Sequence, residues 1–379
     1  MKRILIAATT TEYGYQRETL RGVRSYAEEQ RWTLLVRLEK TAIESLSPSY
    51  FKDVDGCILD LTDMNFFRRF ADVPGPKVSY CDCLASSPVP RVTMDNAQAG
   101  RLAAEHFLER NIKNMAFFGT DLGDHYALQR QDGFVNTLKG RNARFESLSH
   151  TIVSENDGRA FRDWLDRALK PVGLLAADDN RARMIAQRCV EWGINVPRDV
   201  LILGFNNDVF HCELCQPSLS SVIMPSRAIG YKAAEMLDQL MQGRKLSKEE
   251  FLVPSPGVIE RASTQTVAFD CPELDRALRY IRQNAAQAIG VKQVVDHVAV
   301  SKRSLETLFR KHFSHGPGEE LRRTRLALAK FYLATTNRSI GEVARLSGFS
   351  NIAHLGRVLY RYEKQTPVEF RRRHASVGE

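Results

Sequence analysis

The segment EVARLSGFSNIAHLGRVLY, residues 342–360, decides how the C-terminal part of the chain folds. Gly348 divides it into two short stretches and suits a tight turn between two helices. In the second stretch Leu355, Val358 and Leu359 recur at helical spacing, which predicts a buried face. A helix hairpin is therefore expected, and its opposite edge carries Asn351, His354, Arg357 and Arg361.

The same pattern occurs a second time, 49 to 50 residues earlier in the chain. VVDHVAVS at 294–301 matches VARLSGFS at 343–350, and Leu305 and Phe309 fall on the apolar positions of the following helix. Two copies in matched register are more specific than one copy, because an isolated amphipathic hairpin is common. The outward positions of this earlier copy are Lys302, Arg303, Glu306 and Arg310.

Donor side chains along the second helix of such a pair can read base edges in the major groove of DNA. For a single residue, a solvated helix surface explains the pattern equally well, but it does not explain two matched copies. The helix expected at 318–336 would hold the copies roughly 25–30 Å apart, about one turn of DNA. Ser301 and Ser350 are expected to cap the second helices, with free amides near a phosphate. The expected DNA contacts are Ser301, Lys302, Arg303, Glu306, Arg310, Ser350, Asn351, His354, Arg357 and Arg361.

Charge is distributed unevenly along the chain. Residues 273–379 hold 20 Lys and Arg against 10 Asp and Glu, a net of +10. The whole chain carries +9, so the first 272 residues carry −1. A neutral large part joined to a basic part favours a polyanion-binding module attached to a sensor or an enzyme.

Most of the first 250 residues alternate short apolar runs with amphipathic stretches. RILIAAT at 3–9 and VLILGFN at 200–206 are typical of buried strands, whereas 19–30 and 226–243 predict helices. Apolar strands separated by helices imply a parallel sheet covered on both faces. The periodicity lapses around 250–272, which predicts a closing strand followed by a linker.

The C-terminal segment at 339–373, SIGEVARLSGFSNIAHLGRVLYRYEKQTPVEFRRR, resembles the signature of the AraC/XylS family of bacterial transcription activators. Residues 300–333 resemble that family's first helix-turn-helix and linker helix. The resemblance implies an all-α domain with two helix-turn-helix motifs that binds a double-stranded DNA operator. Glu363 and Lys364 depart from the family pattern, which usually has Phe-Gly there, and this changes the turn after the last recognition helix.

The first part resembles a different family, the LacI and periplasmic-binding-protein sensors. The matching segments are VTMDNAQAG (92–100), RQDGF (130–134), LLAADDNRAR (174–183), LILGFNND (201–208) and PSLSSV (217–222). The resemblance implies two α/β lobes with a small ligand in the cleft between them. A LacI-like sensor ahead of an AraC-like domain resembles xylose-operon activators, so the expected ligand is a sugar, with a pentose favoured.

By this resemblance the ligand contacts are expected at Arg17, Tyr126, Arg130, Asp179 and Asn206. A guanidinium can bridge vicinal hydroxyls, a carboxylate can accept from them, and an aromatic ring can cover an apolar sugar face. The amide of Asn206 stands where many relatives have Asp, and it both donates and accepts. For each residue a structural salt bridge or hydrogen bond is the alternative. Tyr13 and Tyr15 either reach the cleft or pack on the lobe surface.

The main alternative is a sugar-processing α/β enzyme with a nucleic-acid-binding tail. The sequence contains no P-loop, no glycine-rich dinucleotide turn and no G-x-S-x-G motif, so an enzyme is not expected. Cys212 and Cys215 have the spacing of half a zinc site, but no second pair follows, and Cys81 and Cys83 are too close together to complete one. We therefore expect buried or loop thiols, no metal and no cofactor.

The expected organisation is a ligand-sensing domain at 1–262, a linker at 263–272 and a DNA-binding domain at 273–379. The two helix-turn-helix motifs are expected at about 291–313 and 340–362. No apolar run has the length of a membrane span or a signal peptide, so we expect a cytoplasmic protein with no membrane partner. The family resemblance implies a homodimer, and RNA polymerase as a partner if the protein is an activator.

Overall fold

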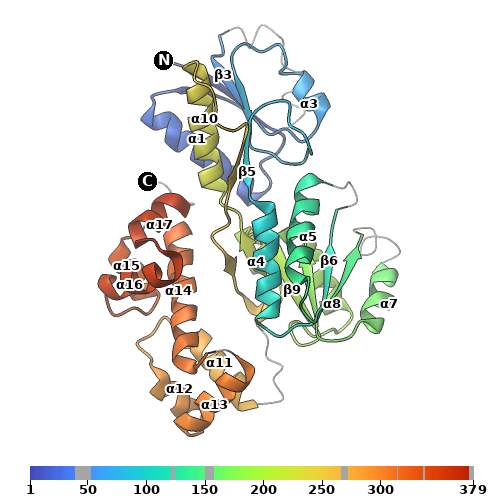
Figure 1. Ribbon diagram of the computed structural model, residues 1–379, viewed down its shortest axis with the longest axis vertical. Coiled ribbons are helices and arrows are strands. Elements are labelled where there is room, and N and C mark those ends of the chain that lie inside the picture. The colour runs from blue at the N-terminus through green and yellow to red at the C-terminus, as the bar shows by residue number, and fades with distance from the viewer. Residues whose placement is uncertain are drawn as a thin grey trace. The chain divides into compact units, whose positions relative to one another are not determined.

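The computed structural model forms two units (Figure 1), Met1–Leu108 with Ile112–Thr264, and Glu109–Asn111 with Gln265–Glu379. No helix of the described residues is long and apolar enough to cross a membrane. The structure describes residues 1–38, 53–120, 124–149, 158–265, 272–313, 315–335 and 338–374.

The first unit contains two lobes, each built on a six-stranded sheet. The N-terminal lobe has the strand order β11-β5-β4-β3-β1-β2, and all its described pairings are parallel. Its strands are β1 Arg3–Ala8, β2 Thr33–Leu38, β3 Gly56–Leu59, β4 Lys77–Ser79, β5 Arg91–Met94 and β11 Glu250–Val253, and its helices are α1 Gly14–Glu29, α3 Met64–Arg68 and α10 Ser226–Met241.

The C-terminal lobe has the strand order β12-β10-β9-β8-β6-β7, with β12 antiparallel to β10. A 3₁₀ turn, Ala262–Thr264, ends the unit and buries Ser263 and Thr264. The strands are β6 Asn114–Phe118, β7 Arg144–Leu148, β8 Val172–Ala176, β9 Val200–Asn206, β10 Ser220–Ile223 and β12 Val258–Ile259. The helices are α4 Asn96–Leu108, α5 His125–Leu138, α7 Arg159–Arg167, α8 Asp179–Glu191 and α9 Val209–Leu214.

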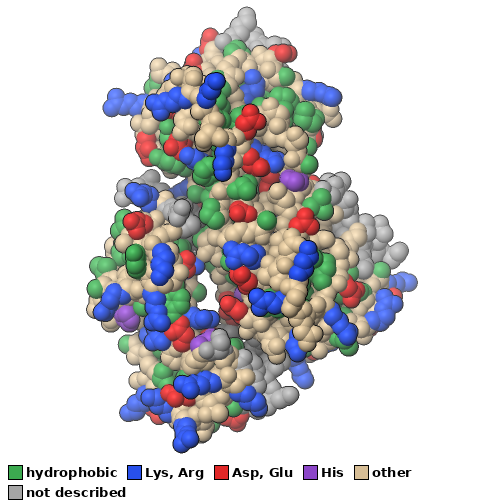
Figure 2. All heavy atoms as spheres, viewed as in Figure 1, with side chains coloured by type: hydrophobic (Ala, Val, Ile, Leu, Met, Phe, Trp, Pro, Cys, Tyr) green, Lys and Arg blue, Asp and Glu red, His purple; other side chains and the backbone are tan. Residues whose placement is uncertain are grey.

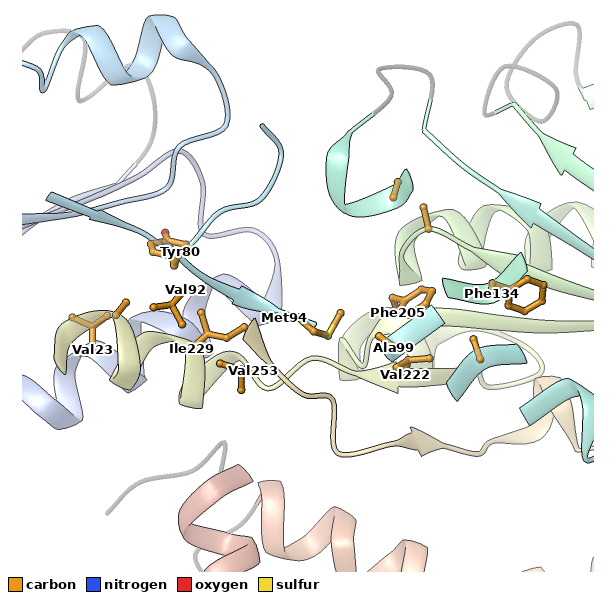
Figure 3. Packing of buried hydrophobic residues seen from close by; sticks show 14 of the residues in the cluster. Val23, Tyr80, Val92, Met94, Ala99, Phe134, Phe205, Val222, Ile229 and Val253 are labelled. Carbon is orange, nitrogen blue, oxygen red and sulfur yellow. The ribbon is translucent and has the colours of Figure 1, made fainter. Parts of the chain in front are cut away.

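One apolar cluster runs through both lobes of this unit (Figure 3). It includes Val92 and Ile229 in the N-terminal lobe and Phe134 and Phe205 in the C-terminal lobe, all with 0% exposure. Met94, at the end of β5, lies between these groups where the chain passes from one lobe to the other. The central strands are apolar on both faces because helices cover both sides of each sheet.

Several helices begin earlier than the apolar periodicity predicts. The helix expected at 19–30 begins at Gly14, and helix α5 begins at His125 although only 133–140 shows the helical pattern. The physical reason is that the first turns of these helices face the gap between the lobes. Polar side chains such as Tyr15 and Tyr126 lie there, so these turns lack the apolar repeat that marks a buried helix face.

The second unit is entirely helical among its described residues. Helix α14 contributes Leu321 to a first core around α11–α13, and Leu326, Ala329 and Leu333 to a second core around α15–α17. The expected α/β domain followed by an all-α domain with two helix-turn-helix motifs is confirmed. The helices are α11 Pro272–Asn284, α12 Val291–Val298, α13 Lys302–His312, α14 Pro317–Thr335, α15 Ile340–Leu346, α16 Ile352–Glu363 and α17 Pro367–His374.

Candidate functional site

A cavity of about 240 Å³ lies between the two lobes of the first unit. It is smaller than the roughly 300–1,000 Å³ typical of sites for drug-sized ligands, so it suits a small molecule. The lining is strongly polar and comes from strand ends and helix N-termini of both lobes, as expected for a ligand site in open α/β sheets. Its main groups are Tyr13, Tyr15, Tyr80, Tyr126, Asp60, Asp82, Asp124, Asp178, Asp179, Asp208, Arg130, Arg181, Asn206, His211, Cys81 and Cys83.

Arg130, on α5, is the most firmly held cation of this cavity. Its Nε donates to Asn96 Oδ1 at 2.9 Å, and its Nη1 donates to the Ala177 carbonyl at 2.6 Å. The guanidinium carbon lies 4.8 Å from the ring centre of Tyr126 and 4.5 Å from that of Phe205. These contacts fix the guanidinium plane in a side chain that is 3% exposed, as a preorganised donor requires.

Asp179, at the start of α8, is held by the protein itself. Its two oxygens accept from the Ser221 hydroxyl at 2.6 Å and from the Asp208 backbone N–H at 2.7 Å. Burial raises the pKa of the Asp179 carboxyl to about 8, although both hydrogen bonds act to lower it. The carboxylate that the sequence predicts as a ligand acceptor therefore supports the turn after β9.

That turn, Asn206–Asp208, belongs to the C-terminal lobe and makes a hydrogen bond to the N-terminal lobe. Asn206 and Asn207 have φ angles of 99° and 52°, which short polar side chains adopt more readily than most. The Asp208 carboxylate caps α9 and also accepts from the Gly14 backbone N–H at 2.7 Å, at the first residue of α1 in the other lobe. Asn206 Oδ1 lies 3.5 Å from Arg130 Nη2, so the predicted pair of ligand groups is brought together.

The three tyrosines considered in the sequence analysis line the cavity, whereas Arg17 does not. The rings of Tyr13 and Tyr15 stack with centroids 5.9 Å apart, and both residues line the cavity, which resolves the alternatives left open by the sequence. Tyr126 lines it too, although Arg130 covers one face of its ring. Arg17 is exposed, donates to the carbonyls of Thr11 and Glu12, and is not among the residues that line the cavity.

Sequence reasoning missed the groups contributed by β3 and by the loop after β4. Asp60 lies at the end of β3 and accepts from the Thr9 hydroxyl at 2.6 Å and from Gln16 Nε2 at 3.1 Å. Tyr80, Cys81 and Asp82 follow β4. The signal available was position alone, because side chains that follow parallel strands meet at one edge of the sheet.

The charges of the lining disfavour an anionic ligand. Six aspartates stand against two arginines there. Three lining side chains also carry a buried polar atom with no partner in the described part of the chain, namely Tyr80 Oη, Arg181 Nε and His211 Nδ1. A neutral ligand with several hydroxyls would satisfy such atoms without adding negative charge.

The cysteine pair at 212 and 215 is a buried pair of thiols. Cys212 is 0% exposed and Cys215 is 7% exposed, and burial raises the pKa of Cys215 to about 11. Among the described residues, no three His, Cys, Asp or Glu side chains are grouped as a metal ion would need.

In the first helix-turn-helix, α12 and α13 place the expected polar edge at the surface. Ser301 caps α13, since its hydroxyl accepts from the Ser304 N–H at 3.0 Å. Lys302, Arg303 and Arg310 are exposed and Glu306 is half-buried. Figure 2 shows Lys and Arg side chains gathered on this end of the second unit.

In the second helix-turn-helix, the expected capping residue is wrong by one position. Asn351 caps α16 by accepting from the His354 N–H at 2.8 Å, whereas the Ser350 hydroxyl lies 3.2 Å from His354 Nδ1. The helix starts one residue later than predicted because two good capping residues are adjacent, and the second one adopts the extended backbone. Arg357 and Arg361 are exposed along α16.

The departures at 363 and 364 have a local explanation. Glu363 accepts from Lys330 Nζ at 2.8 Å, an ion pair that links α16 to α14. Lys364 ends α16 with a φ of 57°, the left-handed conformation for which a glycine is usual.

Comparison with known proteins agrees with both domains. Residues 104–264 match the periplasmic binding protein-like domain family, and residues 294–373 match a helix-turn-helix domain family. The xylose operon regulatory protein of Escherichia coli K12 is 29% identical over 371 residues, covering 94% of each chain. The protein of that name from Haemophilus influenzae is 28% identical over 373 residues, covering 94% of this chain and 95% of its own.

Solved structures match this chain over its whole length or over its first domain. A structure of the xylose-binding transcription activator xylR is 27% identical, covers 99% of each chain and has a TM-score of 0.62. The transcription regulator CcpA of Lactococcus lactis, 18% identical with a TM-score of 0.60, shares the fold over 70% of this chain and 100% of its own. The chain therefore joins a periplasmic-binding-protein-like domain to a C-terminal helix-turn-helix domain, and it is similar over nearly its whole length to xylose operon regulatory proteins.

Proposed function

We propose that this protein is a DNA-binding transcription regulator controlled by a small sugar. The observation that carries the proposal is the presence, on one chain, of a polar interlobe cavity and two helix-turn-helix motifs. The chain is also similar in sequence to relatives named for the xylose operon over nearly their whole length. An enzyme with a nucleic-acid-binding tail has no comparable support.

We propose a pentose as the ligand, with D-xylose as the first candidate. The Arg130 guanidinium presents planar donors that match vicinal hydroxyls, and Asn206 can accept or donate beside it. Tyr15 and Tyr126 line the cavity, and their rings can cover the apolar face of a sugar. Asp179 acts indirectly, since it holds the 206–208 turn in place. The acid-rich lining favours a free sugar over a sugar phosphate.

The experiment is a calorimetric titration of the full chain with D-xylose, L-arabinose, D-ribose, D-glucose and D-ribose 5-phosphate. We expect saturable binding of one of the free pentoses and no binding of the phosphate. Binding of the phosphate ester alone, or of none of these compounds, would contradict the proposed ligand class.

Two arginine variants separate the cavity geometry from the sequence resemblance. Arg130→Gln removes a buried, preorganised donor and should weaken pentose binding at least tenfold. Arg17→Gln should leave affinity within a factor of about two, because the guanidinium is exposed and held by local carbonyls. If Arg17→Gln weakens pentose binding and Arg130→Gln does not, Arg17 contacts the sugar and Arg130 does not.

We further propose that the exposed edges of α13 and α16 contact successive major grooves of an operator. Helix α14 has 19 residues, which gives a length of about 28 Å between the two motifs, close to one turn of DNA. The proposed contacts are Ser301, Lys302, Arg303, Glu306, Arg310, Ser350, Asn351, His354, Arg357 and Arg361. Gel shifts on duplexes from the DNA that flanks the gene test this, with a shuffled duplex as the control.

Homodimer formation, RNA polymerase contact and a cytoplasmic location complete the proposal. For the sugar to act as a switch, it must bind one arrangement of the protein more tightly than another. Gel shifts and solution scattering with and without the bound pentose measure this difference. If the pentose binds but changes neither DNA affinity nor scattering, the switch is refuted while the ligand assignment stands.

A further inference from the structure

We propose that Cys81 and Cys83 form a redox-active thiol pair in the cavity wall, and that closing their disulfide weakens binding of the sugar. The effect on the sugar rests on the proposed function, whereas disulfide formation does not depend on it.

The two sulfur atoms already lie in contact. Cys81 Sγ and Cys83 Sγ are 3.3 Å apart in the loop that follows β4. A disulfide needs about 2.05 Å between them. Small side-chain rotations and a local adjustment of three residues can close this gap, without movement of a strand or helix.

Accessibility distinguishes this pair from the other described cysteines. Cys81 and Cys83 are both partly exposed and line the cavity, so a small molecule that enters the cavity reaches them. Cys57, Cys189 and Cys212 are 0% exposed. Because thiol exchange requires access to the sulfur, reaction is expected at the 81–83 pair and not at these three.

The residue between the two cysteines connects them to the proposed sugar contacts. Asp82 accepts from Asn96 Nδ2, and Asn96 Oδ1 in turn accepts from Arg130 Nε at 2.9 Å. The Cys83 carbonyl accepts from the His125 N–H at 3.2 Å, at the start of α5 in the other lobe. Closing the ring through 81–83 displaces Asp82 and this carbonyl together, which disturbs the support of Arg130 and one contact between the lobes.

The chemistry is exchange with a small-molecule disulfide. The hydrogen bond to Cys83 and burial raise the pKa of Cys81, so Cys83 is the sulfur that attacks first. Attack of the Cys83 thiolate on the disulfide forms a mixed disulfide and releases one thiol. Cys81 Sγ then attacks Cys83 Sγ and gives up its proton, and the leaving sulfur takes that proton and departs as the second thiol. The protein dithiol is oxidised, the reagent is reduced, and the two cysteine protons end on the two released thiols.

The test incubates the full-length protein with glutathione buffers from fully reduced to fully oxidised. Mass spectrometry follows the tryptic peptide 78–91, which contains both cysteines and no other. We expect this peptide to lose two hydrogen atoms and its reactivity to iodoacetamide, and to regain both with dithiothreitol. If it remains alkylatable in oxidised glutathione, or only accumulates the mixed disulfide, the thiol pair is refuted.

Calorimetry with D-xylose on the same samples tests the coupling. Affinity should fall at least tenfold on oxidation and recover on reduction. In Cys83→Ser the affinity, whatever its value, should not change with the glutathione ratio, while Cys189→Ser should respond as the wild type does. Unchanged affinity of the oxidised wild type refutes the coupling. Failure of the reduced protein to bind any pentose contradicts the proposed ligand, and the peptide mass decides the disulfide independently.

Discussion

The two helix-turn-helix motifs align residue for residue, but different residue types form the turn between their helices. Ala299 in the first motif and Gly348 in the second occupy equivalent positions, with φ angles of 59° and 76°. A β-carbon added at Gly348 would lie 2.0 Å from the Ala285 carbonyl oxygen. Glycine in the second turn is therefore needed for close packing as well as for its backbone angle, whereas the first turn accepts a methyl group.

Arg325, on α14, explains why the second turn is so crowded. Its guanidinium donates to the carbonyls of Ala285 at 2.9 Å, Gln287 at 2.9 Å and Ile289 at 2.7 Å, all in the segment between α11 and α12. Gly348 packs on the same Ala285 carbonyl. The second turn thus packs against the segment between α11 and α12, in the first half of the domain.

Among the substitutions in the two turns, Gly348→Ala should lower the free energy of unfolding most. A left-handed alanine costs about 1–2 kcal/mol, and overpacking against a backbone carbonyl typically costs about 1–3 kcal/mol more. We expect the free energy of unfolding of the helical domain to fall by roughly 3 kcal/mol, measured by urea denaturation. Gly316→Ala is the control, because nothing lies within 4 Å of a β-carbon there. Equal effects at the two positions would mean that the contact with Ala285 has no energetic role.

The second comparison concerns what each recognition helix reads. Arg357 on α16 is exposed, has no ion pair among the described residues, and is flanked by Asn351 and His354 rather than by acids. If it reads a guanine, Arg357→Ala costs about 1–3 kcal/mol of DNA affinity and relaxes specificity at one base pair. Binding to operator duplexes substituted one base pair at a time measures this. A uniform loss on every duplex would make it a phosphate contact.

Arg303, near the start of α13, provides the contrasting case. It lies in the first turn of its helix beside Lys302, where a phosphate contact is favoured over a base contact. Arg303→Ala should weaken binding to all sequences alike, by less than Arg357→Ala does, and should reduce the slope of log affinity against log salt by about one. If Arg303→Ala instead removes discrimination at a single base pair, Arg303 contacts a base and not a phosphate.

The sequence predicted the repeats well because buried faces are periodic. Leu305, Phe309, Leu355 and Leu359 all have 0% exposure, as the apolar spacing required. The cap of α16 was missed because Ser350 and Asn351 are both good capping residues, and only the backbone angles distinguish them. Local patterns specify helix faces more firmly than helix ends.

The cavity was less predictable, because its geometry depends on contacts between distant segments. Motif resemblance located Arg130 and Asn206, which the fold brings together. Resemblance alone did not reveal that the Asp179 oxygens accept from Ser221 and from the Asp208 N–H, or that Arg17 donates to the carbonyls of Thr11 and Glu12. Asp60 had no local signal, since a carboxylate after a strand looks like any loop residue until the sheet order is known.

The caps of the two recognition helices should contribute about equally. Removal of a capping oxygen costs about 1 kcal/mol, so Ser301→Ala and Asn351→Ala should each lower the free energy of unfolding by that amount. Ser350→Ala is the matched control in the second motif and should change it by less than about 0.5 kcal/mol. Urea denaturation of the three variants decides the question. A loss at Ser350 comparable to that at Asn351 would restore the cap predicted from the sequence.

Ala299→Gly should have the smallest effect and the opposite sign. Glycine relieves a left-handed strain of about 1–2 kcal/mol, but it also loses about 0.5–1 kcal/mol through the greater freedom of the unfolded chain. A net gain of about 0.5–1 kcal/mol in the free energy of unfolding follows, measured by urea denaturation. A chain that carries both Ala299→Gly and Gly348→Ala has glycine in the first turn and alanine in the second, the reverse of the natural arrangement. If Ala299→Gly is destabilising, the alanine methyl group contributes packing, and the first turn is then as specialised as the second.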